Sequence, residues 1–218
     1  MKENYFKIET ICQRAEEFLT EIKPLRDKHK WSLDPARAAL LVLDMQQYFL
    51  EPASHAFIPA AKAIIPGINR LQALFLNRNL PVIRTRHINN EKNAGQMKKW
   101  WRELITADDP LSAFSAELSD KGVTVLNKSR YDSFYGTDLH RFLTDRGVKQ
   151  MVITGVMTHL CCETTARSAF MRGYDVFFGI DTTATYNRDF HRSSLMNLAH
   201  GFAIPLLETE ITEAFAIK

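Results

Sequence analysis

The run from Ala38 to Leu43 (AALLVL) is apolar at every position. A strand with one face in water alternates apolar and polar residues, whereas a strand covered on both faces is apolar throughout. Strands covered on both faces are typical of parallel sheets, because helices pack against either side of them. The run therefore predicts a strand buried within a parallel sheet.

Short apolar runs alternate with amphipathic stretches along the rest of the chain. The predicted strands are residues 38–43, 81–85, 123–126, 150–154, 174–180 and 202–207. The predicted helices are residues 5–22, 60–78, 95–105, 136–146, 159–172 and 189–200. This alternation predicts βαβ units and an α/β fold of the Rossmann-like type, a three-layer sandwich around a doubly wound, mostly parallel sheet. Lys23-Pro24 is expected to end the first helix.

The amino-acid composition and the distribution of charge bear on which kinds of molecule the protein binds. The 218 residues are 45% hydrophobic and 24% charged, with a net charge of +3, which suits a globular domain. The densest basic cluster, Lys98-Lys99 with Arg102, reads as a solvated helix face, and the other basic residues are scattered. Nucleic-acid binding requires a basic patch or stripe, so we expect no nucleic-acid partner.

The cysteines and the apolar runs bear on the compartment. Three cysteines, two of them adjacent, have no disulfide-framework spacing, which favours a reducing environment. The polar start of the chain lacks the pattern of a signal peptide. No apolar run approaches the roughly 18 residues of a membrane span. We therefore expect a cytoplasmic protein without a membrane partner.

The segment Gly155–Glu163 (GVMTHLCCE) lies between a predicted strand and a predicted helix. Cys161 would then lie in the first turn of that helix, where unpaired N–H groups and the helix dipole favour thiolate over thiol. Buried cysteines are more often small packing residues, which is the alternative role for Cys161 and Cys162. Two other residues, Asp44 and Lys128, favour a nucleophile.

Asp44, Lys128 and Cys161 each follow a predicted strand. Since the carboxyl ends of parallel strands meet at one edge of the sheet, the three side chains are expected to lie together there. A strand-ending carboxylate is also a common turn or cap residue, and residues 128–134 could be an ordinary charged loop. The coincidence of three candidates on one edge favours a catalytic site.

These residues suit thiol chemistry. An ordinary thiol is only about 3% ionised at neutral pH. A cation at Lys128 favours thiolate and an anion at Asp44 opposes it, by about 4 kcal/mol each at ~4 Å, so the two effects largely offset. The proton is then shared by a coupled group. Asp44 can accept it during attack and return it to a departing amine, while Lys128 orients Asp44.

Three motifs resemble those of the isochorismatase-like cysteine hydrolases. They are Trp31–Phe49, Lys128 with Arg130-Tyr131 and Phe134, and Gly155–Cys162. The resemblance spans about residues 31–210. It implies a six-stranded sheet in the order 3-2-1-4-5-6 and divides the chain into a helical extension (1–30) and a hydrolase domain (31–218).

The same resemblance implies roles for individual residues. Asp44, Lys128 and Cys161 would form the catalytic triad. The peptide bond between Val156 and Met157 would be cis, and the N–H groups of Met157 and Cys161 would form an oxyanion hole. The family commonly assembles as dimers or tetramers, so we expect a homo-oligomer, with the N-terminal helix as one candidate contact.

The family contains two chemistries. One branch hydrolyses the C–N bond of small amides or ureides through an acyl-enzyme, and the other hydrolyses a vinyl ether to release pyruvate without needing a thiol. This chain has Leu43 where the second branch usually has His, and Cys161 where it tends to have a small residue. His87 and Met157 also depart from the isochorismatase pattern. Cysteine therefore favours the amide branch, with vinyl ether cleavage and a catalytically silent binding relative as alternatives.

The sequence also gives predictions for cofactors and for the residues that contact substrate. The nicotinamidase sub-branch has an Asp-x-His metal motif where this chain reads His87-Ile88-Asn89, so we expect neither a metal nor another cofactor. His55 and Glu51 are further candidate ligands, but a loop histidine is more often solvated or hydrogen-bonded. Aromatic residues beside an active site belong to the core as often as to the pocket. With that reservation, the residues predicted to contact a small-molecule substrate are Phe49, His87, Trp101, Tyr131 and Phe134. Arg86 or Arg130 could pair with a substrate carboxylate, although a structural ion pair is the favoured interpretation of each.

Overall fold

A six-stranded sheet, parallel throughout, forms the centre of the computed structural model, which describes residues 1–216. The strands are β1 (Ala38–Leu43), β2 (Val82–His87), β3 (Thr124–Lys128), β4 (Gln150–Val156), β5 (Asp175–Ala184) and β6 (Ile204–Leu206). Their spatial order is β3-β2-β1-β4-β5-β6, which confirms the predicted fold class and strand order.

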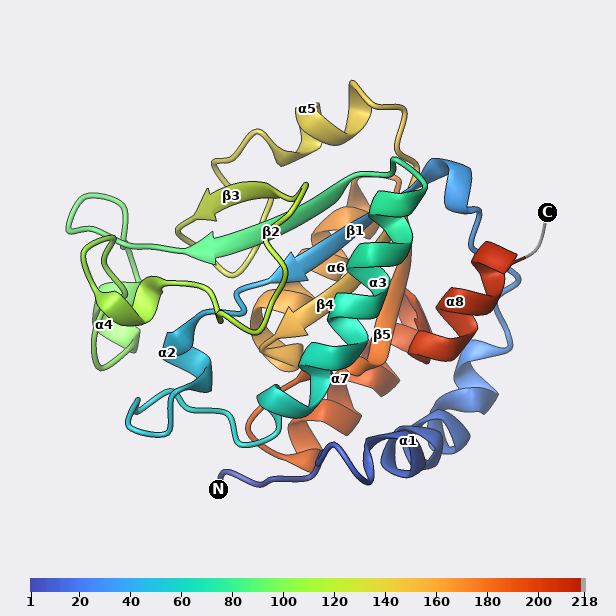
Figure 1. The fold of residues 1–218 in the computed structure, drawn as a ribbon, viewed down its shortest axis with the longest axis horizontal. Coiled ribbons are helices and arrows are strands. Elements are labelled where there is room, and N and C mark those ends of the chain that lie inside the picture. Colours follow the sequence, from blue (N-terminus) through green and yellow to red (C-terminus); the bar gives the residue numbers. More distant parts are fainter. Residues whose placement is uncertain (217–218) are drawn as a thin grey trace.

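Helices cover both faces of the sheet. They are α1 (Ile11–Arg26), α2 (Gln47–Leu50), α3 (Ile65–Asn77), α4 (Met97–Trp100), α5 (Leu139–Thr144), α6 (Glu163–Met171), α7 (Arg188–Gly201) and α8 (Glu208–Ala216). Figure 1 shows α3 in front of the sheet and α6 behind it. Helix α8 packs against α3, and α7 packs against α6. Within residues 1–216, no helix is both long and apolar enough to cross a bilayer.

Local sequence explains where the longer helices begin and what they bury. Pro66 lies in the first turn of α3, where a missing N–H costs no hydrogen bond. Ile68, Leu71 and Phe75 recur at helical spacing and are buried. At α7, the Asn187 side chain accepts a hydrogen bond from the Phe190 N–H at 2.8 Å, as an N-cap does.

The core is built around β1 and β4, the two central strands. Every residue of both strands is buried. Leu41 pairs with Ile83 of β2 on one side and with Ile153 of β4 on the other. The apolar run 38–43 is therefore covered on both faces, as its composition predicts.

Gly155 allows β4 to pass close to β1. Its φ is +104°, a backbone conformation that side chains rarely adopt. A Cβ built there would lie 2.1 Å from the carbonyl oxygen of Leu43. Only glycine fits this contact, which brings the end of β4 beside the residue that precedes Asp44.

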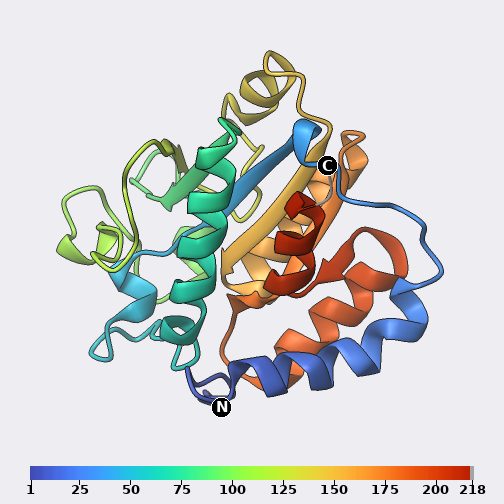
Figure 2. The ribbon, with the colours of Figure 1, turned by 45° about the vertical axis from the view of Figure 1, so that its right-hand side comes forward.

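The N-terminal helix differs from its predicted limits of 5–22. It begins at Ile11, because Tyr5 and Phe6 are directed inward together from a non-helical segment, and Phe6 is fully buried. It continues past Pro24 to Arg26. Arg26 forms an ion pair with Glu210 of α8 at 2.9 Å, and this tertiary contact favours the extra residues. Figure 2 shows α1 running alongside α7.

Two further helical predictions need correction. Residues 95–105 form only the single turn of α4, and the rest of that stretch is a loop at the carboxyl edge of the sheet. The sequence pattern predicts no helix after the last strand, yet the structure has α8 there, and this helix buries Ile211 and Phe215. Strand β5 also extends past its predicted end at residue 180 to Ala184.

Candidate active site

Four neighbouring strands deliver polar side chains to one edge of the sheet. Asp44 follows β1, while His87 and Lys128 are the last residues of β2 and β3. Strand β4 leads through Met157 into a π-helical turn, η4 (Thr158–Cys162), which carries Cys161. The winding of the chain reverses between β1 and β4, which is where ligands bind in open α/β sheets. The structure thus brings Asp44, Lys128 and Cys161 together.

Asp44 is a buried carboxylate held by two partners. Thr85 donates a hydrogen bond to Oδ1 at 2.7 Å, and Lys128 Nζ lies 2.7 Å from Oδ2. The φ of +50° at Asp44 turns the chain sharply at the strand end, a conformation that aspartate tolerates better than most residues. Burial alone would raise the pKa of Asp44, but the charge of Lys128 reverses this and holds the pKa below its ordinary value.

Lys128 is the charge partner of that carboxylate. Its side chain is fully buried, and Nζ also donates to the Arg130 carbonyl at 2.9 Å and to Cys161 Sγ at 3.3 Å. Burial would lower the pKa of Lys128, but Asp44 and Cys161 outweigh it and the pKa is raised. The resting pair is therefore a carboxylate and an ammonium.

Cys161 is buried next to this pair as a thiol. Burial raises its pKa, Asp44 raises it further, and Lys128 only partly opposes the two. The sequence predicts that the helix terminus favours thiolate and that Lys128 and Asp44 offset one another, but in the structure desolvation adds to the effect of the carboxylate and the pKa of Cys161 is raised. Cys162, by contrast, is fully buried in the core.

The turn before Cys161 contains a cis peptide bond between Val156 and Met157, at the position that the sequence resemblance implies. Val156 is fully buried, while Met157 lies at the cavity described below. The carbonyl of Met157 accepts hydrogen bonds from the Leu160 and Cys162 N–H groups, which holds the turn closed.

His87 is a neutral imidazole beside the pair. Burial, reinforced by the charge of Lys128, lowers the pKa of His87 to about 4. Nε2 lies 2.7 Å from Asn89 Oδ1, an acceptor, so the ring proton is on Nε2. Nδ1 is then an acceptor, 3.4 Å from Lys128 Nζ.

The donor atoms of Asp44, His87 and Cys161 lie within 4.8 Å of one another, a spacing that a metal ion could bridge. The ammonium of Lys128 contacts all three of these side chains. A divalent cation among them would face that positive charge directly. The donor set therefore does not fit a metal, and no catalytic step below uses one.

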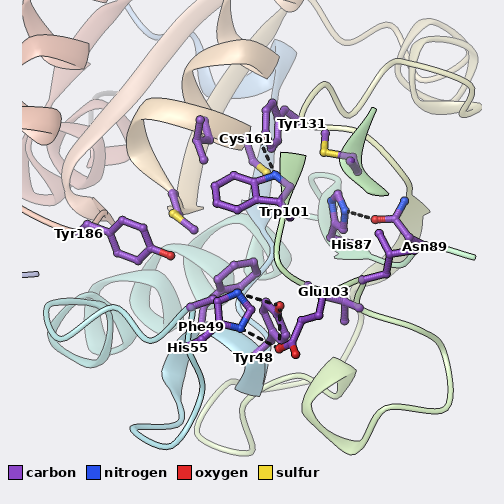
Figure 3. Close-up of a pocket in the computed structure, with 16 residues that line it drawn as sticks. Tyr48, Phe49, His55, His87, Asn89, Trp101, Glu103, Tyr131, Cys161 and Tyr186 are labelled. Carbon is purple, nitrogen blue, oxygen red and sulfur yellow. Dashed lines mark hydrogen bonds and ion pairs between the residues drawn. The ribbon is translucent and has the colours of Figure 1, made fainter. Parts of the chain in front are cut away.

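Cys161 and His87 open into a cavity with a mainly apolar lining (Figure 3). Four of the five residues predicted to contact substrate, Phe49, His87, Trp101 and Tyr131, line it. Trp101 and Tyr131 are joined by a hydrogen bond of 2.7 Å. The other apolar lining residues are Ala56, Met97, Leu104, Ile105, Met157 and Leu160.

Phe134, the fifth, does not line the cavity. Its ring is buried and stacks on Tyr174 with 6.0 Å between centroids, and the Arg172 guanidinium covers it. The prediction that Phe134 contacts substrate is therefore wrong. It belongs to the lysine-loop motif in sequence, but the chain turns it into the core.

Several lining residues were missed by sequence reasoning: Tyr48, Asn89, Glu103 and Tyr186. Glu103 lies in the stretch predicted as helix, where it reads as an ordinary surface residue. His55, interpreted as solvated or hydrogen-bonded, lines the cavity and forms a hydrogen bond with Glu103. The spacing of 48 residues between these two carries no local signal, whereas Asn89, two residues after His87, could have been found from the strand end.

The comparison with protein families concerns most of the chain. A family model described as the isochorismatase domain matches residues 38–210. The chain belongs to the isochorismatase family. Its homologues there are hydrolases, and the match begins with β1 and includes all three triad candidates.

This chain is similar to members of the isochorismatase family that have different names. Nicotinamidase 3 of Arabidopsis thaliana is 38% identical over 76% of this chain and 82% of its own length. Enterobactin synthase component B of Escherichia coli is 33% identical over 80% of this chain, which covers 62% of that protein. Among solved structures, a cysteine hydrolase from Pseudomonas syringae superimposes with a TM-score of 0.82 at 26% identity, covering 86% of this chain and 96% of its own.

Proposed function

We propose that this member of the isochorismatase family hydrolyses the C–N bond of a small amide or ureide through a covalent intermediate on Cys161. The single observation that carries the proposal is the placement of the thiol. Sγ lies at the wall of a cavity, 3.3 Å from Lys128 Nζ and within 4.8 Å of an Asp44 carboxylate oxygen. A nucleophile, a base and an orienting cation are thus within reach of a bound substrate.

The first half of the proposed reaction forms a thioester. Sγ attacks the carbonyl carbon while its proton passes to Asp44, which is ionised at rest. The carbonyl oxygen becomes an oxyanion, for which the N–H groups of Met157 and Cys161 are the proposed donors. Asp44 then gives the proton to the departing nitrogen as the C–N bond breaks. Lys128 remains charged and stabilises each anion in turn.

The second half releases the acid. Water attacks the thioester carbonyl and gives a proton to Asp44. The tetrahedral intermediate collapses, the C–S bond breaks, and the proton returns to sulfur. The net reaction consumes one water and yields a carboxylic acid and ammonia or an amine. A resting thiol suits this cycle, because sulfur gives up one proton to the leaving nitrogen in the first half and regains one from water in the second.

Two features favour an amide over the vinyl ether reaction. Vinyl ether cleavage in this family does not need a thiol, so a cysteine directed into the cavity would have no role. The vinyl ether substrate also carries the carboxylate that leaves as pyruvate. Within residues 1–216, no Lys or Arg side chain lines the cavity to receive such a carboxylate, since Lys128 is behind it and paired to Asp44.

The test compares cysteine variants on a panel of small amides and ureides, with isochorismate as a separate substrate. Cys161→Ala is expected to lower kcat for the preferred amide by at least about 10³-fold, because the covalent route is lost. Cys162→Ala is the matched control, since Cys162 is its neighbour in the same turn but lies in the core. Cleavage of isochorismate that survives in Cys161→Ala, with no amide turned over, would assign the chain to the other branch. Amide hydrolysis that survives would refute the nucleophile.

A further inference from the structure

The cavity contains one carboxylate besides the triad, and it belongs to a hydrogen-bonded group of three side chains. Glu103 Oε1 lies 2.7 Å from His55 Nδ1 and accepts a hydrogen bond from the Tyr48 hydroxyl at 3.2 Å. We call these residues the Glu103 group. Figure 3 shows the three pointing toward one another on the lower side of the view, with Cys161 above them.

Hydrogen bonding leaves part of the carboxylate available. Nδ1 of His55 donates to Oε1, because a carboxylate can only accept. Both recorded bonds go to Oε1, so Oε2 accepts none from residues 1–216. His55 and Tyr48 hold the carboxylate in place, and the Glu103 side chain keeps 55% of its surface exposed.

The negative charge of Glu103 makes this part of the cavity selective for the charge of a ligand group. Glu103 is the only Asp, Glu, Lys or Arg among the described residues that line the cavity. The surrounding walls are aromatic and aliphatic, which weakens solvent screening of its field on the cavity side. A ligand group near Oε2 is stabilised if it is cationic or donates a hydrogen bond, and it is repelled if it is anionic.

We propose that the Glu103 group is a specificity subsite that binds a cationic or hydrogen-bond-donating end of the substrate, opposite the carbonyl attacked by Cys161. This inference rests on the proposed amidase function and names the class of amide: a small, flat, largely apolar body with a positive or donor group at its far end.

The probes are two amides of the same shape. The N-methylpyridinium form of nicotinamide and meta-toluamide differ by one positive charge at the ring atom that carries the methyl group. Each is compared for kcat/KM with the wild type and with Glu103→Gln, which keeps the shape and removes the charge. The wild type should favour the cationic probe, and Glu103→Gln should reduce that preference by about fivefold, a modest value because Glu103 is half-exposed. Glu91→Gln is the control, an exposed glutamate outside the cavity.

Equilibrium binding separates this inference from the proposed function. The affinities of both probes are measured on Cys161→Ala and on Cys161→Ala with Glu103→Gln, where no turnover is needed. A cationic preference that falls only with Glu103→Gln supports the subsite even if neither amide is hydrolysed. Equal preference in both backgrounds, or no binding of either probe at ~10 mM, overturns the subsite while leaving the thiol mechanism to its own test.

Discussion

At the scale of single residues, the buried Asp44–Lys128 pair decides the chemistry of the site. Neither charge would remain ionised at this depth without the other, because burial opposes the charged form of both. The pair keeps Asp44 as a carboxylate, and that carboxylate together with burial raises the pKa of the Cys161 thiol. The site is thus a set of coupled protons rather than a preformed thiolate.

Removing the cation should therefore cost stability. In Lys128→Met, Asp44 loses the cation that keeps it ionised and is left buried with no charged partner, and we expect the free energy of unfolding at neutral pH to fall by about 3–5 kcal/mol. Lys149→Met, at an exposed lysine, should change it by less than about 0.5 kcal/mol. Urea denaturation monitored by circular dichroism measures both.

The loss of stability in Lys128→Met should become smaller as the pH falls. The folded-state pKa of Asp44 is lowered, so its stabilisation is present above its ordinary value of 3.8 and is lost as the pH falls through the folded value. In Lys128→Met, burial without the cation raises the pKa of Asp44 above 3.8, so the gap between wild type and the variant should narrow as the pH falls through that raised value and narrow further below pH 3.8. A gap that is constant across the acid range would show that packing, not charge, causes the loss.

At the scale of elements, the approach of β4 to β1 positions the two halves of the site. Leu43 and Gly155 are paired in register, and one residue beyond each strand the chain changes direction, at Asp44 and at Met157. Asp44 and the turn that leads to Cys161 are neighbours because these strands are in contact without an intervening side chain.

A methyl group at this contact should be poorly tolerated. In Gly155→Ala, the Cβ would lie 2.1 Å from Leu43 O, so we expect the free energy of unfolding to fall by more than about 3 kcal/mol. Gly147→Ala is the control, since Gly147 also has positive φ, at +67°, but open space around it. That control should lose only about 1 kcal/mol, the cost of the backbone conformation. Similar losses in the two variants would contradict the close-contact argument.

At the scale of the whole molecule, the N-terminal segment is joined to the nucleophile turn through the core. The Tyr5 hydroxyl accepts a hydrogen bond from the Thr185 N–H at 3.0 Å and lies 3.2 Å from Nδ1 of His191. The same Nδ1 is 3.0 Å from the hydroxyl of Thr158, which begins η4. Burial lowers the pKa of His191 to about 3, so the ring is neutral and Nδ1 accepts while Nε2 donates to the Ile180 carbonyl.

Loss of the Tyr5 hydroxyl should weaken this link. Tyr5→Phe leaves the Thr185 N–H without its acceptor, and we expect the free energy of unfolding to fall by about 1–2 kcal/mol. Tyr135→Phe, at a tyrosine that is 59% exposed, should have no measurable effect. Thermal or urea unfolding of the two variants measures these changes. Equal stability of Tyr5→Phe and wild type would show that the Tyr5 hydroxyl does not contribute to the stability of the fold.

Much of this molecule follows from local sequence, because the determining interactions are local or repetitive. The apolar run 38–43 predicts a buried strand, and the alternation of strands and helices predicts the parallel sheet. Parallel strands place their carboxyl ends on one edge, so the sequence by itself predicts that Asp44, Lys128 and Cys161 lie together. The strand order and the cis bond were implied by the family resemblance.

Other features were decided only by the tertiary structure, because they depend on contacts between residues that are far apart in the sequence. The thiol pKa depends on total burial, which no short motif encodes. The direction of Phe134 depends on Tyr174, and the continuation of α1 past Pro24 depends on Glu210. Glu103 and His55 form a subsite across 48 residues of chain because loops with no periodic pattern fold over the same sheet edge. Sequence periodicity determines which elements form, whereas packing between remote segments determines what their side chains face.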